Sequence, residues 1–180
     1  KERFTPSIVI GYDTRYNSKE FAEEVAKVMA ANGIKVYLTQ GDSPTPCVVL
    51  AMRNKQTAGA IMITASHNPP EYNGIKFFDG KTLGPAMPEL TKAITKNVQE
   101  LQEIRILDSL KSEFIETFDS IPDYINYLKE ELKIDFDLIR ESKLKIVFDP
   151  LFGTGRVYER ILNAFGIPII MIQTALRSAL

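Results

Sequence analysis

The segment from Ala58 to Thr64 constrains the fold of this chain more than any other. Written as a strand, it places Ala60 and Met62 on one face and Ile61 and Ile63 on the other, so both faces are apolar. A strand that is buried on both faces belongs to a sheet with helices above and below it. The sequence therefore predicts a layered α/β domain.

Two further strands and a helix precede this segment. Strands are predicted at Ser7–Gly11 and Ile34–Leu38, because both are short apolar runs. Between them, Asn17 suits a helix N-cap, Glu20 follows three residues later as in a capping box, and Gly33 suits the helix end. The apolar face of this helix is expected to consist of Phe21, Val25, Val28 and Met29. A strand–helix–strand run of this kind predicts two parallel strands.

Three more elements are predicted in the first half of the chain. A helix from Cys47 to Asn54 follows Pro44 and Pro46, which cost little where N–H groups have no helical partner. A fourth strand, Ile75–Phe78, comes after the turn signal Asn73-Gly74. A long amphipathic helix starts near Pro88, with an apolar side made of Leu90, Ile94 and Leu101. The buried core is expected to include Val9, Ile10, Val25, Val36, Ile61, Ile63 and Phe77.

A second unit is predicted towards the end of the chain. Strands are expected at Lys145–Phe148 and Ile167–Ile172, joined by the turn Gly153-Thr154-Gly155 and a helix from Val157 to Phe165. A helix from Asp119 to Leu132 is expected to precede this unit, with inward residues Ile125, Leu128 and Leu132.

These elements together predict a three-layer α/β/α sandwich with a mixed, mostly parallel sheet, plus the start of a second similar domain. We expect the first domain to span residues 1–138 and a truncated second domain to span 139–180.

The charge balance and cysteine content exclude several classes of protein. Lys and Arg total 22 against 23 Asp and Glu, and such a balance argues against nucleic-acid or acidic-membrane binding, which needs a positive field. The single cysteine, Cys47, cannot form an internal disulfide. No signal peptide is evident and the apolar runs are too short to cross a bilayer, so a cytoplasmic location is expected.

Polar loops follow three of the predicted strands. They are Gly11–Arg15, Gly41–Pro46 and Thr64–Pro70. The carboxyl ends of parallel strands share one edge of a sheet, where ligands bind in open α/β folds. The third loop holds the only histidine, His67, beside Ser66.

Simpler interpretations of these residues stay open. Loops rich in Ser, Asn and Pro are usually only turns. Arg15 could form a surface ion pair with Asp13, and Lys76 could be a solvated strand residue. Ser66 and His67 are poor candidates for a Ser–His pair, because adjacent side chains point apart. A serine hydrolase is disfavoured, since Gly-X-Ser-X-Gly is absent.

The run from Gly59 to Lys76, which reads GAIMITASHNPPEYNGIK, closely resembles the signature of the α-D-phosphohexomutases. That family includes phosphoglucomutases and phosphomannomutases. Three shorter matches occur in the family's order along the chain: Gly11–Arg15, Pro44–Pro46 and Asp149–Gly155.

The resemblance implies roles for five residues. Ser66 matches the phosphoserine, which would also hold a metal ion through its phosphate, and His67 matches the neighbouring active-site histidine. Lys76 matches the lysine proposed in proton transfer, and Arg15 matches an active-site arginine. Arg15, Lys76 and Asn68 would bind phosphate. Whether Lys76 or His67 is the general base stays open, since a lysine must lose its proton first whereas a histidine titrates near neutral pH.

The resemblance also implies a reaction and its partners. Phosphate would move reversibly between the 1- and 6-hydroxyls of a hexose, such as glucose or mannose, through phospho-Ser66 and a hexose 1,6-bisphosphate. Mg²⁺ would be the cofactor, with its other ligands outside this chain, in the remaining domains of the same enzyme. The chain alone would then be an inactive fragment. The alternative function is a non-catalytic phosphosugar-binding or assembly module.

Overall fold

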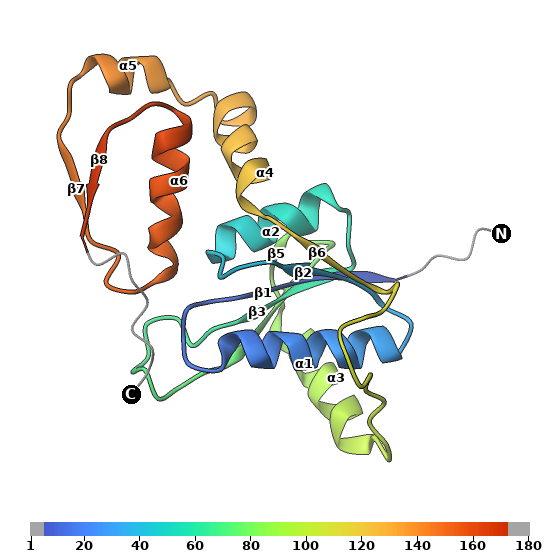
Figure 1. Ribbon diagram of the computed structural model, residues 1–180. Coiled ribbons are helices and arrows are strands. Elements are labelled where there is room, and N and C mark those ends of the chain that lie inside the picture. The colour runs from blue at the N-terminus through green and yellow to red at the C-terminus, as the bar shows by residue number, and fades with distance from the viewer. Residues whose placement is uncertain (1–5, 173–180) are drawn as a thin grey trace.

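A computed structural model describes residues 6–172 and shows a sheet between two helices (Figure 1). Within this range the main sheet has six strands in the order β5-β4-β3-β1-β2-β6. Its parallel strands are β1 (Ser7–Tyr12), β2 (Lys35–Thr39), β3 (Gly59–Ile63) and β6 (Ile115–Phe118). The antiparallel strands are β4 (Ile75–Asp79) and β5 (Gly84–Pro85). This mixed, mostly parallel sheet confirms the predicted fold class, although β5 and β6 were not predicted.

The register places the carboxyl ends of the central strands side by side. Tyr12 at the end of β1 pairs with Ile63 at the end of β3, and Ile10 pairs with both Leu38 and Ile61. Loops that leave β1, β2 and β3 therefore emerge at one edge of the sheet, as the pattern of polar segments predicts.

Helix α1 (Ser18–Ala31) covers one face of the sheet with a stripe of small residues. The buried positions are Ser18, Ala22, Ala26 and Ala30. The predicted face was wrong in part: Phe21 is 45% exposed, while Val25 and Met29 only flank the core. Small side chains let the helix lie close to the sheet, which displaces the bulky residues to its margins.

The predicted capping box of α1 is absent. Asn17 does occupy the N-cap, but in a left-handed conformation and, within the described residues, without a side-chain capping bond. Its side chain therefore does not start the helix in the way that the sequence pattern suggests.

Helix α2 (Thr45–Asn54) covers the opposite face and completes the three layers. It starts at Thr45, two residues before the predicted Cys47, because Pro46 fits the first helical turn. Val48 packs in the cluster of Val9 and Met62 on this face of the sheet. Of the predicted core, all residues are buried except Val25 and Phe77, which are partly buried.

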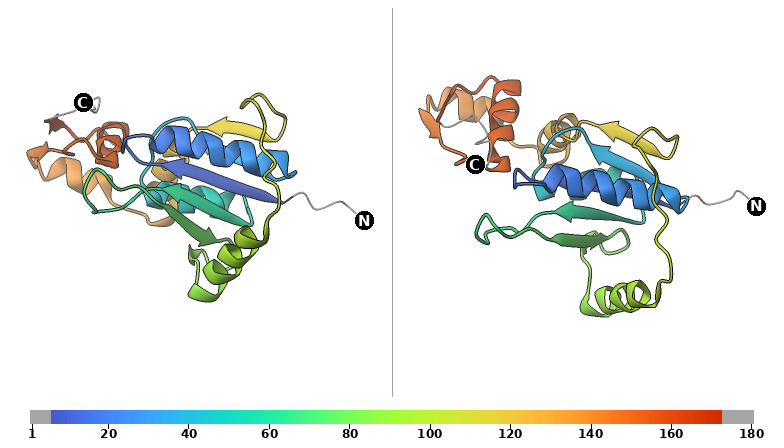
Figure 2. Two further views of the ribbon diagram at one scale, coloured as in Figure 1. Left: turned by 90° about the horizontal axis from the view of Figure 1, so that it is seen from below. Right: turned by 60° about the horizontal axis from the view of Figure 1, so that its bottom comes forward.

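Helix α3 (Pro88–Glu100) stands apart from the sheet (Figure 2). None of its own residues is buried, and Leu101 of the predicted apolar side lies just beyond the helix end. No helix within residues 6–172 combines the length and apolar character needed to cross a membrane.

The second unit pairs β7 (Ile146–Phe148) with β8 (Ile169–Met171) in parallel, with α6 (Val157–Ala164) between them. A short 3₁₀ turn, η2 (Thr154–Arg156), replaces the simple turn that was predicted.

The predicted helix from Asp119 to Leu132 is instead α4 (Ile121–Asn126) followed by a π-helical turn, η1 (Tyr127–Glu131). Ile125 and Leu128 pack against the core as expected, but Leu132 lies beyond this turn and is exposed.

A third apolar core joins the two units. The unpredicted helix α5 (Phe136–Glu141) stacks Phe136 on Phe165, which follows α6. Cys47 and Ile121 belong to the same core as Ile161. The expected boundary after residue 138 therefore runs through a continuous packed region, and it stays a proposal.

Candidate active site

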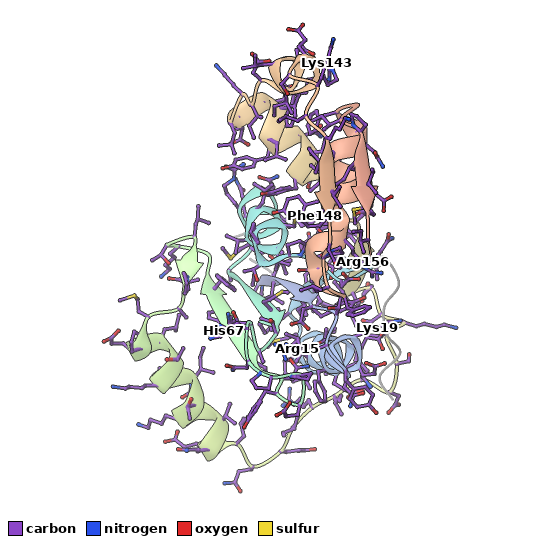
Figure 3. The ribbon with its side chains drawn as sticks, turned by 90° about the vertical axis from the view of Figure 1, so that its left-hand side faces the viewer. Arg15, Lys19, His67, Lys143, Phe148 and Arg156 are labelled. Atoms are coloured by element: carbon purple, nitrogen blue, oxygen red, sulfur yellow. The ribbon has the colours of Figure 1, made fainter. Side chains whose placement is uncertain are left out.

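One cavity of about 800 Å³ lies at the carboxyl edge of the sheet. It is lined by the loop after β1, the loop after β3 and Lys76 of β4, together with a loop of the second unit. All five residues implied by the resemblance lie on its wall: Arg15, Ser66, His67, Asn68 and Lys76. Figure 3 shows Arg15 and His67 on this side of the molecule.

Ser66 combines exposure with backbone strain. Its φ of 60° lies in the left-handed region, which is unusual for a residue with a Cβ atom. Its N–H donates to the Oγ1 of Thr64 at 2.9 Å. A non-glycine residue in this region costs on the order of 1–3 kcal/mol and persists only where the surroundings hold it.

Arg15 holds the loop that carries Ser66. Its Nη2 donates to the carbonyls of Ser66 at 2.9 Å and Asn68 at 2.7 Å. Its Nη1 donates to the carbonyls of Pro69 at 2.8 Å and Tyr72 at 3.0 Å. The side chain is only 14% exposed. In this conformation the guanidinium clamps the serine loop, and its role as a phosphate ligand stays a prediction.

A largely buried network orients Arg15. Asp13 forms an ion pair with the Nε of Arg15 at 3.3 Å and accepts a hydrogen bond from the Oγ of Ser18 at 2.6 Å. Asn73 donates to that same Oγ at 2.8 Å, so the loop before β4 joins the network. Sequence reasoning missed Ser18 and Asn73, because one looked like a helix start and the other like a turn residue.

Lys76 and His67 supply the candidate proton-transfer groups. Lys76 lies on β4 opposite Met62 of β3, and the antiparallel pairing brings it back to the serine loop. Both side chains are exposed, and in the described part of the chain neither is engaged by a hydrogen bond or an ion pair. They are therefore available to a ligand in the cavity.

Leu151, Phe152, Gly153 and Thr154 of the second unit complete the wall. Leu151 and Phe152 have φ values of 48° and 72°, so two successive non-glycine residues are left-handed. The sequence gave Gly153–Gly155 as a turn and Asp149–Gly155 as a match to the family, but it did not place this segment on the wall of the Ser66 cavity.

Between residues 6 and 172 there is no group of three or more His, Cys, Asp or Glu side chains that could hold a metal ion. Asp13 lines the cavity, but its carboxylate oxygens already engage Arg15 and Ser18. A phosphate on Ser66 would add oxygen ligands for a metal ion here, and it would form one part of a coordination shell.

Comparison with known proteins agrees with this architecture. A family model described as phosphoglucomutase/phosphomannomutase, α/β/α domain I, matches residues 1–105. A phosphoglucomutase from Staphylococcus haemolyticus (strain JCSC1435) is 41% identical over 155 residues, which are 83% of this chain. This chain spans 28% of that relative's length.

Solved structures show the same fold. A Thermus thermophilus protein described as a phosphomannomutase matches with a TM-score of 0.82 at 34% identity, over 95% of this chain and 38% of that one. The open form of parafusin, a phosphoglucomutase from Paramecium, matches with a TM-score of 0.77 over 93% of this chain and 36% of that one. Its 24% identity supports the fold alone. Because the family model covers more than half of the sequence, including the whole serine loop, the chain belongs to the phosphoglucomutase/phosphomannomutase family.

Proposed function

We propose that Ser66 is the phosphoryl carrier of a phosphohexomutase, which moves phosphate reversibly between the 1- and 6-hydroxyls of a hexose. The observation that carries the proposal is the loop clamp. Arg15 binds four carbonyls of one loop, and that loop presents a strained, exposed serine to a cavity. A loop held this firmly positions the hydroxyl, and phosphoryl transfer depends mainly on positioning and charge neutralisation.

The side chains around Ser66 suit a phosphoserine. A serine phosphate carries about −1.5 to −2 charges at neutral pH, so cationic neighbours stabilise it. Lys76 lies on the cavity wall with His67, and neither has a protein partner within the described range. The carbonyl oxygens of the serine loop accept hydrogen bonds from the Arg15 guanidinium. The positive charge of the guanidinium offsets the partial negative charge of these oxygens near the phosphate.

In the transfer step, a sugar hydroxyl attacks the phosphorus of phospho-Ser66 and passes its proton to Lys76 or His67. The bond from phosphorus to the serine Oγ breaks, and Oγ takes up a proton. The resulting hexose 1,6-bisphosphate then reverses its orientation in the cavity and returns its other phosphate to Ser66. Either residue can serve as the base, and the kinetics of Lys76→Ala and His67→Ala would distinguish them.

The substrate in this proposal is a hexose phosphate, of glucose or mannose, since the relatives are named for both. The phosphate of Ser66 is this chain's contribution to a Mg²⁺ site whose other ligands lie in further domains of the enzyme. Residues 1–138 and 139–180 would be the first domain and part of the second, in a cytoplasmic enzyme.

Mass spectrometry of the full-length protein tests the proposal. After incubation with glucose 1,6-bisphosphate, we expect one added phosphoryl group on the tryptic peptide Gln56–Lys76, located at Ser66 by fragmentation. Ser66→Ala should lose both this group and mutase activity. Ser109→Ala, which removes an exposed serine outside the cavity, should keep both.

Two outcomes would reject the proposal. One is phosphorylation elsewhere with Ser66 unmodified, and the other is normal turnover by Ser66→Ala. A bound hexose phosphate without any phosphoryl transfer would favour the non-catalytic phosphosugar-binding module instead.

A further inference from the structure

The second-unit wall of the Ser66 cavity, residues 151–154, lies next to an ion pair that spans the two units. We propose that Asp42 and Arg156 form a positioning latch that holds this wall against the cavity. Arg156 lines a smaller cavity and not the Ser66 cavity, so in this proposal it acts on the reaction through the wall. The expected effect on kcat/KM rests on the proposed function, whereas the ion pair between Asp42 and Arg156 does not depend on it.

The latch has two contacts between one guanidinium and one carboxylate. Arg156 donates from Nε to the Oδ2 of Asp42 at 3.2 Å, and from Nη2 to the Oδ1. Asp42 lies in the loop after β2, at the sheet edge that also carries the serine loop. Figure 3 shows Arg156 where the second unit meets this edge.

The latch also borders the loop after β1. Asp42 and Arg156 share the wall of a smaller cavity, of about 270 Å³, with Thr14 and Arg15. Thr14 and Arg15 line the Ser66 cavity as well. The ion pair therefore meets the first unit beside the segment that clamps the serine loop.

Burial makes this ion pair unlike an ordinary surface pair. The Asp42 side chain is only 8% exposed. A carboxylate withdrawn from water in this way needs its partner, because removal of Arg156 would leave a charge without compensation. The hydrogen bond with Asp42 raises the pKa of Arg156, in line with this pairing.

The wall has a strained backbone, and such strain persists only where the surrounding structure holds it. Leu151 and Phe152 are successive left-handed residues, each costing on the order of 1–3 kcal/mol. Two local hydrogen bonds shape the turn: the Leu151 N–H donates to the Oδ1 of Asp149 at 2.9 Å, and the Gly153 N–H donates to the carbonyl of Pro150 at 2.8 Å. Both stay inside the second unit, whereas the contact of Arg156 reaches the first.

Arg160 provides a matched control. It lies about one turn beyond Arg156, in α6, and also pairs with a carboxylate of the first unit, Asp119, at 2.5 Å. That pair is more exposed and lies further along the chain from the wall. A substitution of Arg160 removes one ion pair between the units but leaves the ion pair of Asp42 with Arg156 beside the wall.

The test compares variants of the full-length protein by hydrogen exchange and by kinetics, well below the unfolding temperature of each variant. Arg156→Gln should speed amide exchange in residues 149–155 and lower kcat/KM for the hexose phosphate by about tenfold or more, because a misplaced wall misaligns the reacting groups. Arg160→Gln should change neither.

Two further variants separate the two-point contact from charge alone. The exchanged pair, Asp42→Arg with Arg156→Asp, should restore part of the exchange protection and part of kcat/KM. Arg156→Lys keeps the charge but loses the two-point contact, so its amide exchange and its kcat/KM should lie between those of Arg156→Gln and Arg160→Gln.

Equal effects of Arg156→Gln and Arg160→Gln would overturn the latch, as would unchanged exchange in Arg156→Gln. If Arg156→Gln does not fold, the same comparison is made with Arg156→Lys, and exchange equal to that of the unsubstituted protein would overturn it. Absence of mutase activity in the unsubstituted protein would reject the proposed function, while exchange would still decide whether the latch holds the wall.

Discussion

At the scale of single residues, Ser66 pairs a backbone conformation that favours glycine with a hydroxyl that the proposed reaction requires. Ser66→Gly removes a Cβ atom from a left-handed position, which should raise the free energy of unfolding by about 1–2 kcal/mol. The greater entropy of glycine in the unfolded chain should lower it by about 0.5–1 kcal/mol. We expect Ser66→Gly to exceed Ser66→Ala in free energy of unfolding, measured by urea denaturation, while both lack the phosphoryl acceptor. Equal stability of the two variants would show that the backbone at this position is relaxed.

Cys47 is expected to be inert in the folded protein. Burial, followed by the nearby carboxylate of Asp119, raises the pKa of its thiol to about 12. Only the thiolate is nucleophilic, and a raised pKa leaves very little of it at about pH 8. We expect slow reaction with Ellman's reagent in buffer and rapid stoichiometric reaction in denaturant. Rapid labelling of the native protein would contradict the buried position of Cys47 in the first turn of α2.

The site residues differ in how far the sequence could predict their positions. Ser66 and Arg15 follow apolar strands in polar loops, so their meeting at one sheet edge was predictable. The link from Asn73 through Ser18 to Asp13 was not, because the bond from Asn73 to Ser18 joins residues that are distant along the chain and depends on tertiary packing. Its only sequence signal, Asn73-Gly74, indicates a turn.

At the scale of elements, the turn after β4 offers a test of how closely backbone segments pack. A Cβ atom at Gly80 would lie 2.2 Å from the carbonyl oxygen of Thr57 and 2.8 Å from the backbone of Ala58. Backbone atoms cannot move aside cheaply, so Gly80→Ala should lower the free energy of unfolding by about 1–3 kcal/mol. Gly41→Ala is the control, since no described atom lies within 4 Å of its added Cβ. Urea denaturation of both variants checks this, and similar losses would refute the packing argument.

Hydrophobic patterns predicted the strands better than the helix faces. The central strands have apolar residues on both sides, so β1, β2 and β3 stand out in the sequence. Strand β6 does not, because Ile115–Phe118 is short and carries Glu116 and Thr117 between its apolar ends. The buried face of α1 was misjudged because alanine contributes weakly to a hydrophobic pattern, although its size permits the close packing seen here.

At the scale of the whole molecule, the two units are joined by contacts that the sequence could not reveal. The sequence predicted a strand–helix–strand run near the end of the chain, and β7, α6 and β8 confirm these elements. Besides the third apolar core, two ion pairs join the second unit to the first, Asp42 with Arg156 and Asp119 with Arg160, and the partners in each are distant along the chain. Charged residues of this kind look like solvated surface positions in a sequence, so the second-unit wall of the cavity was missed.

Within the described residues, candidate Mg²⁺ ligands are not grouped together. Mg²⁺ binds oxygen ligands in near-octahedral geometry and gives up its water reluctantly, so a site with few protein oxygens binds it weakly. The described residues contain no group of three or more His, Cys, Asp or Glu side chains that could hold a metal ion, and the Asp13 oxygens near Ser66 already engage Arg15 and Ser18. We therefore expect calorimetry to detect only weak Mg²⁺ binding to the unphosphorylated chain.

Phosphorylation of Ser66 should strengthen that binding, because it adds three acceptor oxygens and about −1.5 to −2 charges at neutral pH. The comparison is between the chain phosphorylated at Ser66 and the Ser66→Ala variant exposed to the same phosphoryl donor, which should keep the weak binding of the unphosphorylated chain. Tight binding to Ser66→Ala would reveal a carboxylate site independent of the phosphate. Equally weak binding to the phosphorylated chain would contradict the prediction, because the phosphate would then add no effective ligand until the rest of the enzyme surrounds it.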